Sequence, residues 1–228
     1  MNSAPEMTPE GYLDTSCREM ISPDLGAAFT QKCVTMNPGG RSAQPIRKAF
    51  EIFIYILSGT GRLTVQGQVI LLEPTSYAYI PPLNEIEIAQ DGGRPLVFML
   101  MEKPNSPGRT DFRMIHGVEK NVPAERLRSS VEIKTLFEEK QCAFSVLVVV
   151  AEFKAGSSNP ECHIEEHCIY TLEGRGTYYL NQERYLLGPG DYLWLRSNTL
   201  HQLTGTSQEP WKLLVYKGVP SENPYQYA

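Results

Sequence analysis

The chain has 228 residues, of which 41% are apolar and 21% charged, and its formal net charge is −5 at pH 7. This length suffices for one large β domain or for two small domains, each with its own core. The negative charge and the lack of a lysine- and arginine-rich run argue against nucleic-acid binding, and the lack of an 18-residue apolar run argues against a membrane-spanning segment.

The N-terminal segment and the cysteines indicate the compartment. Residues 1–14 contain no basic stretch followed by an apolar core, so we expect no secretory signal. The five cysteines are odd in number and form no C-x-x-C motif, which favours free thiols in a reducing environment. The sequence therefore predicts a cytoplasmic protein.

Two related domains follow one another along the chain. Residues 1–25 are interpreted as a lead-in segment, residues 26–104 as the first domain and residues 131–220 as the second. The stretch between them, 105–130, has no clean periodicity and is interpreted as a connection. The remaining residues, 221–228, form a tail.

An internal repeat supports this division. Residues 55–77 match residues 170–192 at a constant offset of 115 without a gap. A repeat of this length predicts two copies of one domain rather than a short-period solenoid. The identical pairs are Tyr55/Tyr170, Leu57/Leu172, Gly59/Gly174, Gly61/Gly176, Leu71/Leu186, Leu72/Leu187, Pro74/Pro189 and Tyr77/Tyr192.

Both copies have the pattern of β-strands. Short runs of Ile, Val, Leu, Tyr and Phe alternate with Gly, Pro and Asn turns, as in the turn at 188–191 before the apolar run 192–195. Many short strands with regular turns are typical of an all-β barrel or sandwich.

The second copy contains a set of side chains suited to a metal ion. Of the four histidines, His116 lies in the connection, whereas His163, His167 and His201 lie in the second domain. Glu161 and His163 are two residues apart, so they share one face if they lie on a strand. Imidazole nitrogen and carboxylate oxygen suit divalent first-row metals, and four protein ligands on an octahedral ion leave two positions for substrate or water.

The first copy serves as an internal control. Subtracting 115 places Ile46, Lys48, Ile52 and Ile86 opposite the four candidate ligands, so the first domain cannot hold the same metal. The ligands are therefore not a by-product of the fold.

Other interpretations are open for these residues. A single histidine is more often a surface or core residue than a ligand, and only the combined spacing favours a metal site. We expect Glu165 and Glu166 to form a solvated turn, with a ligand or base as the lesser alternative. Cys162 and Cys168 are expected to point away from the ligands as packing residues, although a thiolate ligand would favour zinc.

These residues resemble the cupin metal motif. In ordinary cupins the first ligand of the pair is His and the third is Glu, whereas here Glu161 comes first and His167 third. That exchange is similar to the (S)-ureidoglycine aminohydrolases, which are bicupins of purine breakdown. The strings EIFIYILSGTGRLTVQG, YIPP, LEGRGTYYLN, GDYLWL and LLVYKG carry the same resemblance, which extends from about Gly26 to Pro220.

The resemblance implies a fold and an activity. The fold would be a bicupin of two tandem jelly-roll β-barrels, the first without metal. The family binds Mn²⁺ and releases ammonia from (S)-ureidoglycine in allantoin breakdown. By position, Glu161, His163 and His167 match metal ligands, with Glu161 also placed to move a proton, while Tyr178 and Lys217 match residues that contact the substrate. A solvated strand end is the alternative for Lys217.

Two departures from the family weaken the assignment of the substrate. The family's fourth ligand is Gln, where this chain has His201, and Leu213 stands where a polar aromatic residue is expected. His201 can still bind a metal, as it does in ordinary cupins, but it replaces an amide with a group that titrates. The substrate could therefore be a similar small ureido or amino acid.

Two alternative functions remain open. Two histidines and a carboxylate with free coordination positions also suit an iron-type dioxygenase or isomerase acting on another small acid, so Fe²⁺ or another divalent metal is an alternative to Mn²⁺. A non-catalytic cupin that binds a small molecule is the second alternative. Barrel edges are compatible with a homo-oligomer, and the expected partner is a small-molecule substrate.

Overall fold

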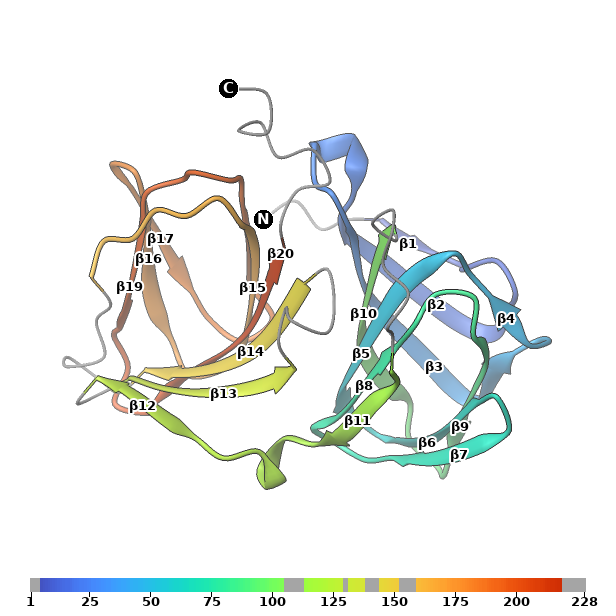
Figure 1. The fold of residues 1–228 in the computed structure, drawn as a ribbon. Coiled ribbons are helices and arrows are strands. Elements are labelled where there is room, and N and C mark those ends of the chain that lie inside the picture. Colours follow the sequence, from blue (N-terminus) through green and yellow to red (C-terminus); the bar gives the residue numbers. More distant parts are fainter. Residues whose placement is uncertain (1–4, 105–112, 129–130, 138–143, 152–158, 219–228) are drawn as a thin grey trace. The chain divides into compact units, whose positions relative to one another are not determined.

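The computed structural model describes residues 5–104, 113–128, 131–137, 144–151 and 159–218. It divides into two compact units, residues 1–121 and 122–228, whose strands are coloured along the chain in Figure 1. The division falls within the predicted connection 105–130, whose limits stay a prediction, and the predicted tail 221–228 lies outside the described residues. No helix among the described residues is long and apolar enough to cross a membrane.

The first unit is built from antiparallel strands in one curled sheet, with the order β11-β8-β5-β10-β3-β9-β6-β7. The segment interpreted as a lead-in contributes β2 to this sheet, because β2 pairs with β3. The elements are β1 (Glu6–Met7), β2 (Tyr12–Ile21), η1 (Pro23–Leu25), β3 (Thr30–Ser42), β4 (Ile46–Arg47), β5 (Phe50–Ser58), β6 (Thr60–Val65), β7 (Gln68–Leu72), β8 (Ser76–Ile80), β9 (Glu85–Asp91), β10 (Leu96–Pro104), β11 (Ile115–Val118) and η2 (Glu119–Asn121).

The core of the first unit follows from the two-residue period of its strands. Ile52, Ile54 and Ile56 of β5 alternate along the strand and all belong to one buried cluster. Leu63 of β6 and Ile88 of β9 lie in the same cluster, so strands from opposite parts of the sheet enclose it. The apolar alternation in the sequence therefore lines the inside of a barrel.

The second unit repeats this plan with two sheets. One sheet has the order β12-β13-β14-β20-β15-β18 and the other has β17-β16-β19. Its core joins both sheets, since Tyr178 of β16 clusters with Ile169 of β15 and with Leu213 and Val215 of β20. The elements are β12 (Glu125–Arg128), β13 (Val131–Phe137), β14 (Phe144–Ala151), β15 (Glu166–Glu173), β16 (Gly176–Leu180), β17 (Glu183–Leu187), β18 (Tyr192–Leu195), β19 (His201–Gly205) and β20 (Trp211–Gly218).

Strand register reproduces the 115-residue repeat. Ile52 is opposite Glu102 across β5 and β10, and His167 is opposite Lys217 across β15 and β20. The bridge between Glu161 and His201 matches the pairing of Ile46 with Ile86 in the first unit. The two units are thus copies of one all-β fold, as the sequence predicts.

Two repeated glycines hold the hairpins of the copies close to a neighbouring strand. Gly59 and Gly174 have φ values of 80° and 70°, and a Cβ at either would lie 2.1 Å from the carbonyl oxygen of Pro95 or 2.3 Å from that of Pro210. Only glycine takes this conformation without strain and leaves space for the backbone.

We predict that Gly176→Ala destabilises the second unit. A Cβ at Gly176 would lie 1.9 Å from Cε3 of Trp211, whose side chain is fully buried, so the indole would have to move. The expected loss is about 1–3 kcal/mol in the free energy of unfolding, as for other overpacked cores.

Both tryptophans of the chain, Trp194 and Trp211, lie in the second unit, so denaturation followed by tryptophan fluorescence reports on this unit. Gly188→Ala in the same unit is the matched control, because a Cβ there would meet only the Arg175 side chain, at the ordinary contact distance of 3.7 Å or more. Equal unfolding midpoints for the two variants would contradict the packing described here.

Candidate metal centre

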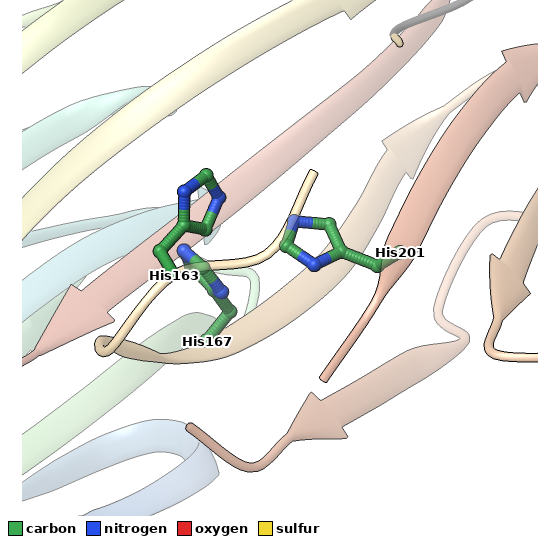
Figure 2. Close-up of side chains that lie close together, drawn as sticks. All are labelled: His163, His167 and His201. Atoms are coloured by element: carbon green, nitrogen blue, oxygen red, sulfur yellow. The ribbon is translucent and has the colours of Figure 1, made fainter. Parts of the chain in front are cut away.

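Three histidine rings converge inside the second unit, as Figure 2 shows. One ligand nitrogen from each of His163, His167 and His201 lies within 4.8 Å of the other two. The ring centroids are 4.9–5.1 Å apart in all three pairs. They form the one group of three or more metal-ligating side chains among the described residues, so the sequence-predicted histidines do come together.

Backbone hydrogen bonds fix the segments that carry the histidines. Glu161 and His201 exchange two N–H···O bonds of 2.8 Å, and the Asn198 N–H donates to the His163 carbonyl at 2.7 Å. His167 lies in β15, paired with Leu195 of β18 and Lys217 of β20. Residues that are far apart in the sequence are therefore held together by the ladder of the barrel.

The hydrogen bonds of the rings leave nitrogen lone pairs at the centre. Nδ1 of His201 lies 2.8 Å from the Thr199 carbonyl oxygen; because a carbonyl only accepts, Nδ1 carries the proton and Nε2 keeps its lone pair. The Nε2 atoms of His163 and His167 are buried and have no hydrogen-bond partner among the described residues. Buried polar atoms of this kind are costly unless something binds them, and a metal ion would do so.

Burial keeps the imidazoles of His163 and His167 neutral. Burial lowers the pKa of His167 to about 2, with smaller contributions from the charges of Lys217, His201 and His163. Burial also lowers the pKa of His163, followed by the effects of Lys217 and His201, while Glu161 and Glu165 oppose the shift. Neutral imidazole is the form that binds metal, so the site is prepared for a cation at neutral pH.

Glu161 lies at the edge of the histidine group. Its Oε2 is 3.7 Å from Nε2 of His163, and its side chain is 35% exposed. The carboxylate is not among the atoms that lie within 4.8 Å of one another. The structure thus places Glu161 beside the centre, and its roles as a ligand and as a proton carrier stay predictions.

Two aromatic rings support the histidines from one side. Tyr178 is 4% exposed and stacks on His201 with ring centroids 6.0 Å apart and an interplanar angle of 11°. Trp211 meets Tyr178 edge-on at 6.5 Å. Burial, and then the charge of Glu161, raises the pKa of Tyr178 far above its usual value, so its hydroxyl stays protonated.

Lys217 supplies positive charge near the histidines. It is opposite His167 in the ladder, it is half-buried, and its charge lowers the pKa of both His163 and His167. The charge of Lys217 therefore acts on the rings of His163 and His167.

The structure also corrects the expectation for Glu166. Instead of forming a solvated turn, Glu166 is 3% exposed, and its Oε2 accepts a hydrogen bond of 3.1 Å from Nε1 of Trp194. The first unit has the same arrangement at the offset of 115, where Glu51 matches Glu166 and Tyr79 matches Trp194. Glu51 is also buried and accepts a hydrogen bond from the hydroxyl of Tyr79.

Two further residues differ from their expected surroundings or were missed. Cys168 is buried as expected, but Cys162 is exposed and so does not pack in the core. The sequence did not indicate a role for Trp211, whose indole packs against Tyr178. The sequence contains one sign of this packing, the glycine at position 176, which leaves space for the indole.

Comparison with known proteins identifies the fold. A family model described as "Cupin domain" matches residues 32–102 and again residues 149–216. The chain belongs to the cupin family. Since both matched regions are copies of one barrel, it is a bicupin, and its fold class is the one that the sequence predicts.

Two curated relatives share a name. A protein of Oryza sativa subsp. japonica named "Probable (S)-ureidoglycine aminohydrolase" is 25% identical over 91% of this chain and 68% of its own length. The (S)-ureidoglycine aminohydrolase of Escherichia coli (strain K12) is 24% identical over 83% of this chain and 75% of its own length.

Solved structures show the same fold. Protein Ylba from E. coli has a TM-score of 0.82 and 20% identity over 96% of this chain and 88% of its own. The salicylate 1,2-dioxygenase from Pseudaminobacter salicylatoxidans has a TM-score of 0.75 and 11% identity, covering 92% of this chain and 78% of its own.

We predict that His167→Ala abolishes stoichiometric metal binding. The change removes one of three converging nitrogens, so affinity should fall by more than the roughly 10- to 100-fold that loss of an outer partner costs. Elemental analysis after loading with Mn²⁺ and gel filtration measures the metal per chain.

His116→Ala is the control for this experiment, since His116 is exposed on β11 in the first unit. Circular dichroism checks that both variants fold. Full metal content in a folded His167→Ala protein would contradict the proposed centre.

Proposed function

We propose that the second unit is a metal-dependent hydrolase that releases ammonia from (S)-ureidoglycine, or from a similar small ureido or amino acid, in purine (allantoin) breakdown. The observation that carries the proposal is the convergence of three imidazoles, two of them buried, in a bicupin whose curated relatives are named (S)-ureidoglycine aminohydrolase.

The donor set is compatible with a catalytic divalent ion. His163, His167 and His201 would hold it, with Glu161 as a fourth ligand or a close neighbour. Imidazole and carboxylate groups suit Mn²⁺, while Fe²⁺ and other divalent ions would also fit them. When bound, such an ion polarises the substrate and stabilises the negative charge that develops during reaction.

The residues around the histidines could bind and orient the substrate. Lys217 carries a positive charge beside the centre and would pair with the substrate carboxylate. The protonated hydroxyl of Tyr178 would act as a hydrogen-bond donor. The carboxylate of Glu161, which is partly exposed next to His163, is placed to take or give a proton.

The apolar wall affects which substrate fits. Leu213 and Trp211 are fully buried in the core cluster that includes Tyr178. The family resemblance implies a polar side chain at position 213, which would form a hydrogen bond with the substrate. Leu213 cannot form such a bond. A related substrate with a less polar group there is therefore part of the proposal.

An iron-dependent dioxygenase is the second candidate. A set of three histidines with His201 in place of a family glutamine favours it, and a solved protein with this fold is named salicylate 1,2-dioxygenase. Oxygen consumption by the Fe²⁺-loaded protein with small aromatic and aliphatic acids separates it from the hydrolase.

We predict that the Mn²⁺-loaded protein releases ammonia from (S)-ureidoglycine faster than the spontaneous reaction. The metal-free protein and His167→Ala serve as controls, and a coupled assay measures ammonia. A rate equal to that of the metal-free protein at saturating substrate would refute the hydrolase proposal for this substrate.

We further predict that Lys217→Met lowers kcat/KM about 10- to 150-fold, mainly through KM. The reason is the loss of one charge-assisted hydrogen bond worth about 1.5–3 kcal/mol. Lys212→Met on the same strand is the matched control, because the Lys212 ammonium lies 3.7 Å from Glu173 rather than at the centre. Equal KM values for the two variants would argue against carboxylate binding by Lys217.

A further inference from the structure

The first unit contains a cavity of its own although it lacks metal ligands. The cavity has a volume of about 350 Å³ and lies among the segment that follows β1, strands β2, β3 and β10, and Lys48. This volume falls in the range of small-molecule pockets and corresponds to about ten water-sized groups. Side chains therefore do not fill the first unit completely.

Two ammonium groups line this cavity. Lys48 forms an ion pair with Oε1 of Glu102, and Nζ of Lys32 lies 3.4 Å from Oε2 of the same carboxylate. Nζ of Lys32 is also 3.7 Å from Oε2 of Glu19. The Glu102 side chain is 8% exposed, and Glu102 does not line the cavity.

This arrangement leaves donors on the cavity side. Each ammonium carries three N–H groups, and the shared Glu102 carboxylate cannot accept all six. Tyr12 adds a hydroxyl to the wall, and its pKa is raised to about 12 by burial and then by the charges of Glu102 and Cys17, so it remains a donor. Val34 and Leu100 supply an apolar part of the wall, and the exposed Glu10 also lines the cavity.

The repeat relates this cluster to the metal centre. At the offset of 115, Lys48 occupies the position of His163 and Glu102 the position of Lys217. The other ligand positions hold Ile46, Ile52 and Ile86, which belong to or pack against the apolar core. The ammonium group of Lys48 in the first unit thus occupies the position of the candidate metal ligand His163 in the second unit.

We propose that the first unit binds a small monocarboxylate in this cavity. Lys32, Lys48 and the Tyr12 hydroxyl donate hydrogen bonds to its carboxylate, and its short apolar part packs against Val34 and Leu100. Charge-assisted bonds of this type are stronger than neutral ones, which selects an anion over a neutral molecule of the same size. The site needs no metal. This proposal is independent of the hydrolase proposal, so either can fail without affecting the other.

Titration calorimetry with sodium propionate tests this site. The background protein is metal-free His163→Ala/His167→Ala, so that the second unit contributes no carboxylate binding at a metal. We expect saturable binding at one site per chain, weakened at least tenfold by Lys48→Met and several-fold by Tyr12→Phe. Lys120→Met, which removes an exposed ion pair with Glu73 in the same unit, is expected to leave the affinity unchanged.

A second variant protects the test against unfolding. Lys48→Met leaves Glu102 with fewer partners, so Lys48→Met/Glu102→Gln, which removes both charges, is measured beside it with circular dichroism. No saturable binding of propionate at millimolar concentrations, or an affinity of the folded double variant equal to that of Glu102→Gln alone, overturns the proposal.

Discussion

Three imidazoles, two of them buried and that of His163 half-buried, point their nitrogens at one another and impose the main physical constraint on this molecule. Nε2 of His163 and of His167 has no hydrogen-bond partner among the described residues, and burial disfavours protonation of both rings. Such a group is costly in a folded protein unless a cation occupies the centre. The backbone bonds between Glu161 and His201 and the stacking of Tyr178 on His201 hold the rings in this arrangement. The proposed chemistry follows from that convergence.

The two halves of the chain carry different side chains at matched positions of one fold. Strand register is conserved between them, so each ligand position has a counterpart at an offset of 115. Where the second unit has His163, the first has Lys48 in an ion pair with Glu102. Fold alone does not determine function, and here the side chains at matched positions differ between copies in the same molecule.

Much of the fold could be predicted from the sequence, because strand alternation and the repeated turn residues are local signals. The histidine cluster could also be predicted, since one copy carries the ligands and its twin does not. The burial of Glu166 was not predicted, because it depends on a hydrogen bond from Trp194, which lies on β18, the strand paired with β15. The Lys48–Glu102 pair and the support of Tyr178 by Trp211 were missed for the same reason: each joins residues more than 30 positions apart, and spacing along one strand does not reveal such partners.

X-ray absorption spectroscopy of the protein reconstituted with one equivalent of Mn²⁺ tests the central claim most directly. The outer-shell scattering of imidazole is distinctive, and fitting it counts the histidines bound to the ion. We predict three imidazole ligands in the unaltered protein, and loss of this imidazole scattering in His163→Ala, which lacks one of the three converging nitrogens. A spectrum that fits oxygen ligands alone, or that is unchanged in His163→Ala, would show that the ion is bound elsewhere and would contradict the account.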